Sequence, residues 1–127
     1  MNIQEVNAMT VQQAVEYSLD KIVKQGERCM RGDDCTYGDG EGNHCAIGWL
    51  LDADNADLME YEGSVSDIAR CCGVPELIKD NVKVFNTFQC FHDAMHAQHR
   101  EEYKVQLREN GVDTSHTDFQ AWIDLGK

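Results

Sequence analysis

Residues 35–51 constrain the fold more than any other stretch, because a glycine-rich segment meets an apolar run there. The segment reads Cys-Thr-Tyr-Gly-Asp-Gly-Glu-Gly-Asn-His-Cys-Ala-Ile-Gly-Trp-Leu-Leu. Its first three glycines alternate with Asp39 and Glu41, and no apolar residue lies between Tyr37 and Ala46. Because glycine loses the most backbone freedom on ordering, these residues predict a turn. The flanking residues are placed to pair as one short β-hairpin around residues 35–45.

The apolar run that follows, residues 46–51, predicts a short buried helix. Gly48 interrupts it and would let a neighbouring backbone or aromatic ring approach closely. Small thiols in such surroundings behave as buried hydrophobic groups. We therefore expect a structural contact between the turn and the adjoining helices, made by Cys35, Tyr37, Cys45, Ile47, Trp49 and Leu50.

This pattern of Cys-x-Tyr, a glycine-rich turn and Cys-Ala-Ile-Gly-x-Leu-Leu resembles a motif of small uncharacterised bacteriophage and prophage proteins. In that group a helix ending in Gln-Gly precedes the motif, as Gln25-Gly26 does here. A Glu-Gly pair and a later His-Asp pair follow it, as Glu62-Gly63 and His92-Asp93 do here. The resemblance covers roughly residues 10 to 110. It implies a phage-type origin and an intracellular site of action, and it implies no activity.

The rest of the chain has helical periodicity. Thr10 with Gln13 predicts a capped helix over residues 11–25. Later apolar stripes predict helices between residues 64 and 110, with a break near His92-Asp93 and a further helix over about residues 96–110. Ser115 is expected to begin a last short helix. At 127 residues the sequence predicts one domain, 1–127, that is a mainly α, compact helical bundle. Residues 1–9 are expected to be an irregular lead-in, and residues 112–127 a C-terminal loop and short helix.

Composition restricts the cellular setting. No apolar run approaches the length of a membrane span, and the first residues lack the basic and apolar regions of a signal peptide. We therefore expect a protein of the host-cell cytoplasm that does not contact a membrane. In that reducing compartment the six cysteines are expected to be thiols.

Charge is concentrated in the middle of the chain. Between residues 32 and 69 there are ten Asp or Glu and no Lys or Arg, whereas the remainder carries thirteen acids and eleven bases. Such a field repels nucleic acid and attracts basic surfaces.

The first hypothesis is an acidic protein that inhibits a basic host or anti-phage defence protein, with carboxylates imitating nucleic-acid phosphates. The alternative interpretation is that these carboxylates form only a solvated acidic surface. The candidate partner-binding residues are Asp33, Asp34, Asp39, Glu41, Asp52, Asp54, Asp57, Glu60 and Glu62.

Two other classes of function stay open. A small metal enzyme would use His92, His96 and His99, which share one face of an unbroken helix. A thiol enzyme would use His44 with Cys45. A binding module for a small ligand is the other alternative. The simpler interpretation expects no cofactor and no metal: His92 then packs on Tyr37 or Trp49, and Asp93 caps the next helix.

Overall fold

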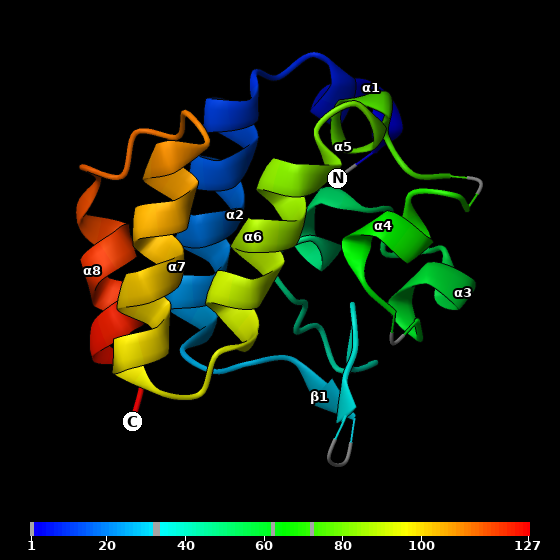
Figure 1. Cartoon of the computed structure of the whole chain (residues 1–127). Helices are drawn as coiled ribbons and strands as arrows, with labels where there is room; N and C mark the ends of the chain where they lie inside the picture. The colour runs from blue at the N-terminus through cyan, green and yellow to red at the C-terminus, as the bar shows by residue number, and fades with distance from the viewer. Residues whose placement is uncertain (1, 32–33, 62, 72) are drawn as a thin grey trace.

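The computed structural model describes residues 2–31, 34–61, 63–71 and 73–127 and is mainly helical, as predicted (Figure 1). In chain order the elements are α1 (Ile3–Asn7), α2 (Val11–Gln25), β1 (Met30–Arg31), β2 (Asp34–Cys35), the 3-10 turn η1 (Gly48–Leu50), α3 (Ala56–Met59), α4 (Val65–Ile68), α5 (Glu76–Lys79), α6 (Val82–Asp93), α7 (Ala97–Glu109) and α8 (Thr117–Asp124). None of the described helices has both the length and the apolar character needed to cross a bilayer.

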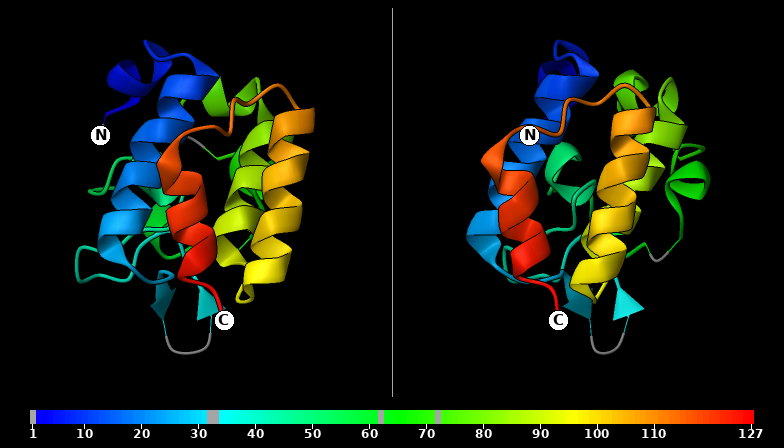
Figure 2. Two further views of the ribbon diagram at one scale, coloured as in Figure 1. Left: turned by 90° about the vertical axis from the view of Figure 1, so that its left-hand side faces the viewer. Right: turned by 60° about the vertical axis from the view of Figure 1, so that its left-hand side comes forward.

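Four longer helices, α2, α6, α7 and α8, stand side by side and enclose the core (Figures 1 and 2). Helix α7 packs on α6 and α8, and α8 also packs on α2. The short helix α4 covers α6 on the side away from α7 and α8 (Figure 1). Aromatic rings dominate the core, and the bulkiest fully buried side chains are those of Phe85, Phe88, Phe91, Phe119 and Trp122.

The first helices are fixed by capping. Helix α2 has the predicted bounds, with the Thr10–Gln13 capping box at its start and left-handed Gly26 (φ 82°) at its end. The irregular lead-in predicted for residues 1–9 is wrong, because residues 3–7 form α1. A second capping box, between Asn2 and Glu5, satisfies its first turn, and the buried Val6 side chain anchors it.

The predicted hairpin region contains one isolated antiparallel bridge, between Gly38 and His44. The two-stranded pairing lies just before it, where Met30 pairs with Cys35 and residue 31 with residue 34. The expected buried helix over residues 46–51 is shorter than predicted. Only residues 48–50 are helical, as the 3-10 turn η1, because the chain is extended again at Leu51.

In the second half of the chain, the expected break near His92-Asp93 separates α6 from α7. Helix α6 ends at Asp93, where Ala94 takes an extended conformation. The predicted loop and short helix of residues 112–127 are present, with α8 as that helix. Its N-cap is His116, whose Nδ1 accepts a hydrogen bond from the Asp118 N–H at 3.1 Å, so the expectation that Ser115 caps it is wrong.

Candidate functional site

The carboxylate of Asp39 builds the glycine-rich turn. Its Oδ1 accepts hydrogen bonds from the backbone N–H groups of Glu41 (2.7 Å) and Asn43 (3.1 Å), and its Oδ2 accepts one from the Asn43 side chain (2.8 Å). Gly40 and Gly42 take positive φ angles of 80° and 96° between these contacts. Partial burial raises the pKa of Asp39, but these hydrogen bonds outweigh burial and lower it below its usual value. Asp39 therefore shapes the turn.

A backbone hydrogen bond joins this turn to the second acidic segment. The Gly38 N–H donates to the Met59 carbonyl at 2.8 Å. A Cβ on Gly38 would lie 2.8 Å from Met59 Sδ and 3.2 Å from His44 Nδ1, so glycine permits the close approach. The second segment has its own carboxylate turn, in which Asp52 Oδ1 accepts from the Asp54 N–H at 3.0 Å. Two acidic segments, residues 38–44 and 52–60, are thereby held against each other.

A cleft of about 290 Å³ lies between the two segments, and we call it the acidic cleft. One wall is bare backbone at three glycines, the other is largely apolar, and two polar side chains complete the lining. The lining residues are Gly38, Gly40, Gly42, His44, Ala53, Ala56, Met59 and Glu60.

Four predicted binding residues border the acidic cleft with exposed carboxylates. Glu60 lines it, Glu41 lies between two lining glycines, and Asp54 and Asp57 each follow a lining alanine in the chain. None of the four forms an ion pair with a described residue. Asp52 is exposed close by and supports its own turn.

The remaining acidic candidates are not all placed. Asp33 and Glu62 lie outside the described residues, and only the backbone of Asp34, in β2, is described. The structure therefore brings together Asp39, Glu41, Asp52, Asp54, Asp57 and Glu60 around the acidic cleft.

The His44 imidazole sits at the inner side of the acidic cleft. Its ring meets Trp49 edge to face at 4.6 Å, and its Nδ1 has no hydrogen-bond partner among the described residues. Burial lowers the pKa of His44, which keeps the ring uncharged at neutral pH. Gln25, at the end of α2, holds the backbone here: its Oε1 accepts from the His44 N–H (2.9 Å) and its Nε2 donates to the His44 carbonyl (3.1 Å).

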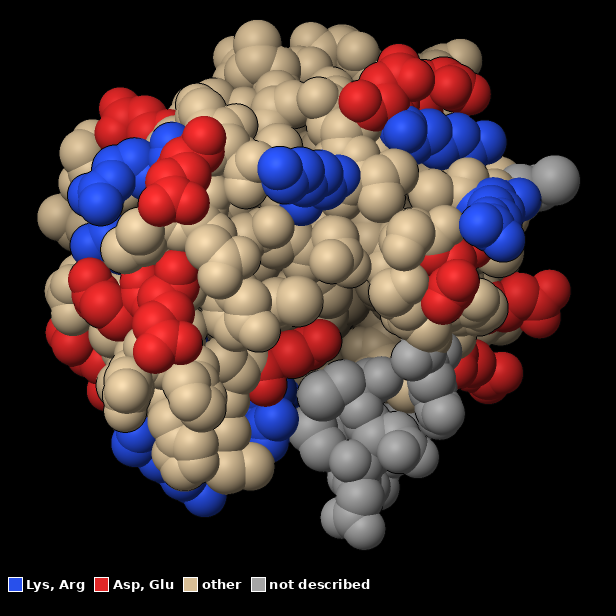
Figure 3. All heavy atoms as spheres, in the orientation of Figure 1, with Lys and Arg blue, Asp and Glu red and all other residues tan. Residues whose placement is uncertain are grey.

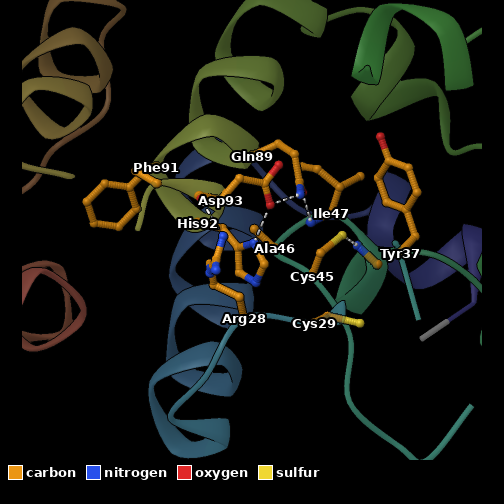
Figure 4. A network of polar contacts seen from close by, with 12 residues as sticks. Arg28, Cys29, Tyr37, Cys45, Ala46, Ile47, Gln89, Phe91, His92 and Asp93 are labelled. Atoms are coloured by element: carbon orange, nitrogen blue, oxygen red, sulfur yellow. Dashed lines mark hydrogen bonds and ion pairs between the residues drawn. The ribbon is translucent and has the colours of Figure 1, made fainter. Parts of the chain in front are cut away.

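A partly buried polar network supports the apolar run that follows the glycine-rich turn (Figure 4). The Ile47 N–H donates to Gln89 Oε1 at 3.1 Å, and Gln89 Nε2 donates to Asp93 Oδ1 at 2.9 Å. The same oxygen lies 2.7 Å from His92 Nδ1, and Arg28 Nη1 donates to the Asp93 carbonyl at 3.1 Å. The end of α6 is thereby tied to the apolar run that follows the turn.

The thiol of Cys45 is part of this core. It is fully buried, and its Sγ accepts a hydrogen bond from the Gly48 N–H at 3.2 Å. Burial, followed by the nearby charge of Asp93, raises its pKa well above the usual value, so the nucleophilic thiolate is disfavoured. His44 directs its ring against Trp49. Burial and the raised pKa of Cys45 therefore disfavour its use as a nucleophile beside His44.

The structural interpretation of the central motif is confirmed for four residues: Tyr37, Cys45, Ile47 and Leu50 are all buried. Trp49 is only partly buried, so the expectation that it forms the core contact is too strong. The side chain of Cys35 lies outside the part that the structure describes.

The predicted histidine face does not form, because α6 ends before His96. His92 is fully buried and stacks on Trp122 with ring centroids 5.4 Å apart, whereas His96 and His99 are exposed beyond the break. Among the described residues, no group of three His, Cys, Asp or Glu side chains is placed to hold a metal ion.

Two expectations about the His92-Asp93 pair are also wrong. His92 packs on Trp122 of α8, with the two rings stacked, and no ring contact joins it to Tyr37 or Trp49 among the described residues. Asp93 does not cap α7, whose N-cap position is His96. Its carboxylate is bound instead by Gln89 and His92.

Sequence reasoning missed the two glutamines that hold the site. Gln89 lies four residues after the core residue Phe85, and a polar side chain on that buried helical face was the available signal. Gln25 ends α2 and had no distinguishing signal, because polar residues are common at exposed helix ends.

No family model, curated protein or solved structure matches the chain.

Proposed function

We propose that the chain is a phage-type acidic binding protein that engages and inhibits a basic host or anti-phage defence protein through the acidic cleft. One observation carries the proposal: the Gly38–Met59 backbone hydrogen bond holds the two base-free acidic segments together. Exposed carboxylates from both segments therefore border one hollow.

The charge distribution supports a basic partner. Carboxylates without ion-pair partners leave their field uncompensated, and such a field accelerates encounter with a surface of opposite charge. On much of the face in Figure 3, Lys and Arg side chains lie near Asp and Glu side chains, so the fields of these neighbouring opposite charges partly cancel.

Imitation of nucleic acid is consistent with the chemistry of these side chains. An ionised carboxylate offers only acceptor oxygens, as a phosphate does, and it pairs with the same Arg and Lys groups. The turn hydrogen bonds at Asp39 and Asp52 fix the backbone that carries the carboxylates, so less conformational freedom is lost on binding. A groove that normally binds the phosphate backbone is the partner surface that such an array fits.

A matched pair of charge-reversal variants tests the proposal. The cleft variant replaces Glu41, Asp54, Asp57 and Glu60 by Lys, and the control variant replaces the exposed Glu27, Glu101, Glu102 and Glu109 by Lys. Both change the net charge equally. A partner is first captured from bacterial lysate with the unmodified protein and identified by mass spectrometry. Its Kd is then measured for all three proteins at two salt concentrations.

We expect the cleft variant to bind at least tenfold more weakly, about 1.4 kcal/mol, and the control to bind nearly normally. Higher salt should weaken the unmodified complex most. Nucleic acid bound by the partner should compete with the protein. Equal binding by the cleft variant, or equal weakening by both variants, would contradict a role for the acidic cleft.

A further inference from the structure

We propose that the acidic cleft is an anchor pocket for one arginine side chain of the basic partner. The inference rests on the proposed function and narrows it, because it names the group that enters the hollow and the walls that hold it. Three properties of the cleft carry it: an apolar wall, a carboxylate at its edge, and an opening walled by glycine backbone.

The apolar wall matches the stem of an arginine. Ala53 and Ala56 are small and exposed, and Met59 adds a flexible thioether beside them. Long basic side chains bury their methylene groups against such surfaces and keep the charged head at a polar site. The volume of about 290 Å³ corresponds to about ten water molecules, which leaves room for the whole side chain.

The carboxylate of Glu60, which lines the cleft, selects a cation. Glu60 is exposed on the cleft wall and has no ion pair with a described residue, and a guanidinium can meet a carboxylate with two parallel hydrogen bonds. The other lining side chain that titrates, His44, is uncharged at neutral pH because burial lowers its pKa, so it does not repel a cation. The nearby Glu41, Asp54 and Asp57 add attraction at longer range.

The opposite wall leaves the approach open. Gly40 and Gly42 carry no side chains, and a Cβ on Gly42 would meet no atom within 4 Å. A planar guanidinium can therefore lie against bare peptide groups. Arginine suits this surface better than lysine, because its head group is planar and more weakly hydrated.

The test needs no partner protein. N-acetyl-arginine methylamide is titrated into the ¹⁵N-labelled full chain at physiological salt, and N-acetyl-norleucine methylamide serves as the uncharged control. We expect saturable amide shifts at Gly40, Gly42, Ala53 and Ala56 with a Kd of roughly 1–10 mM. The norleucine compound should give at least fivefold weaker binding.

Two variants separate shape from charge. Ala56→Leu fills the pocket without changing any charge and should abolish the saturable shifts. Glu60→Gln keeps the shape and should weaken arginine binding at least fivefold. Thermal melts of both variants verify folding. Unsaturable shifts spread over exposed acids such as Glu101, or unchanged binding by Ala56→Leu, would overturn the anchor pocket.

The outcomes also distinguish this inference from the proposed function. If arginine does not bind in the cleft, yet the cleft variant loses the partner, the acidic surface is supported and the anchor pocket is contradicted. If arginine binds and the cleft variant keeps the partner, the proposed function is contradicted, and with it the role of the pocket in partner binding.

Discussion

Replacing Gly48 by alanine should destabilise the protein, although helical propensity alone predicts the opposite. In an unobstructed helical turn this change would stabilise by about 0.5–1 kcal/mol. Here the added Cβ would lie 3.0 Å from the Tyr37 carbonyl carbon, closer still to that carbonyl oxygen, and 3.2 Å from His44 Cβ. Two of these atoms are backbone and cannot rotate away. The chain must therefore separate the turn from η1, at a cost of about 2–3 kcal/mol.

Calorimetry or a urea titration measures this cost. For a chain of 127 residues each kcal/mol corresponds to about 3–5 °C, so the melting temperature should fall by roughly 6–15 °C. Gly111→Ala is the control, because Gly111 has φ 92° with nothing within 4 Å of its Cβ. That variant should show only backbone strain, about 1–2 kcal/mol, and leave the amide signals of residues 37–48 in place. A Gly48→Ala protein as stable as the parent would refute the close approach of the turn to η1.

Three further predictions concern the surroundings of the acidic cleft. Gln89→Leu should lower the free energy of unfolding by about 1–3 kcal/mol in urea titrations, because the buried Ile47 N–H loses its acceptor; an unchanged midpoint would contradict this. Trp49→Phe should change stability by less than about 1 kcal/mol, because the indole Nε1 has no hydrogen-bond partner among the described residues and the side chain is only partly buried; a larger loss would show an undetected indole contact. The folded pKa of His44 lies below its unfolded value, so its contribution is complete above about pH 6.5 and is lost as the pH falls toward the folded pKa. The His44→Phe variant should lose less stability than the parent between pH 8 and 5.5, and parallel stability curves would contradict the lowered pKa.

The local signals of the sequence predicted the elements whose ends are set by neighbouring residues. Helix α2 is the clearest case, because Thr10, Gln13 and Gly26 satisfy its terminal groups without help from distant residues. Asn2 and Glu5 form the same kind of box, but the helix they cap is too short for apolar periodicity to reveal it. A packing contact, made by Val6, decides that helix α1 forms.

Tertiary contacts fix the exact end of α6, which helical periodicity alone does not show. The three-histidine face required a continuous helix past Asp93, whereas the break expected near His92-Asp93 is present at Ala94. In the fold Arg100 donates from Nε to the Ala94 carbonyl at 2.7 Å, which supports the extended residue from the next helix. That contact lies within the α6–α7 corner. The acidic residues, in contrast, were recognisable from composition, although composition could not show that residues 38–44 and 52–60 meet.

The fold gains little from the four exposed carboxylates that border the acidic cleft without an ion pair. Exposed charges contribute about 0–1 kcal/mol even when paired, and Glu41, Asp54, Asp57 and Glu60 have no ion pair with a described residue. Their mutual repulsion opposes the close approach that the Gly38–Met59 hydrogen bond enforces. The turn is held from two other sides, by the neutral amide of Gln25 and by the Asp39 carboxylate, which accepts hydrogen bonds from backbone N–H groups and the Asn43 side chain. Glu41, Asp54, Asp57 and Glu60 thus add surface charge without stabilising the fold. Removing these four carboxylates should leave or raise stability, while a basic partner loses its attraction to the cleft.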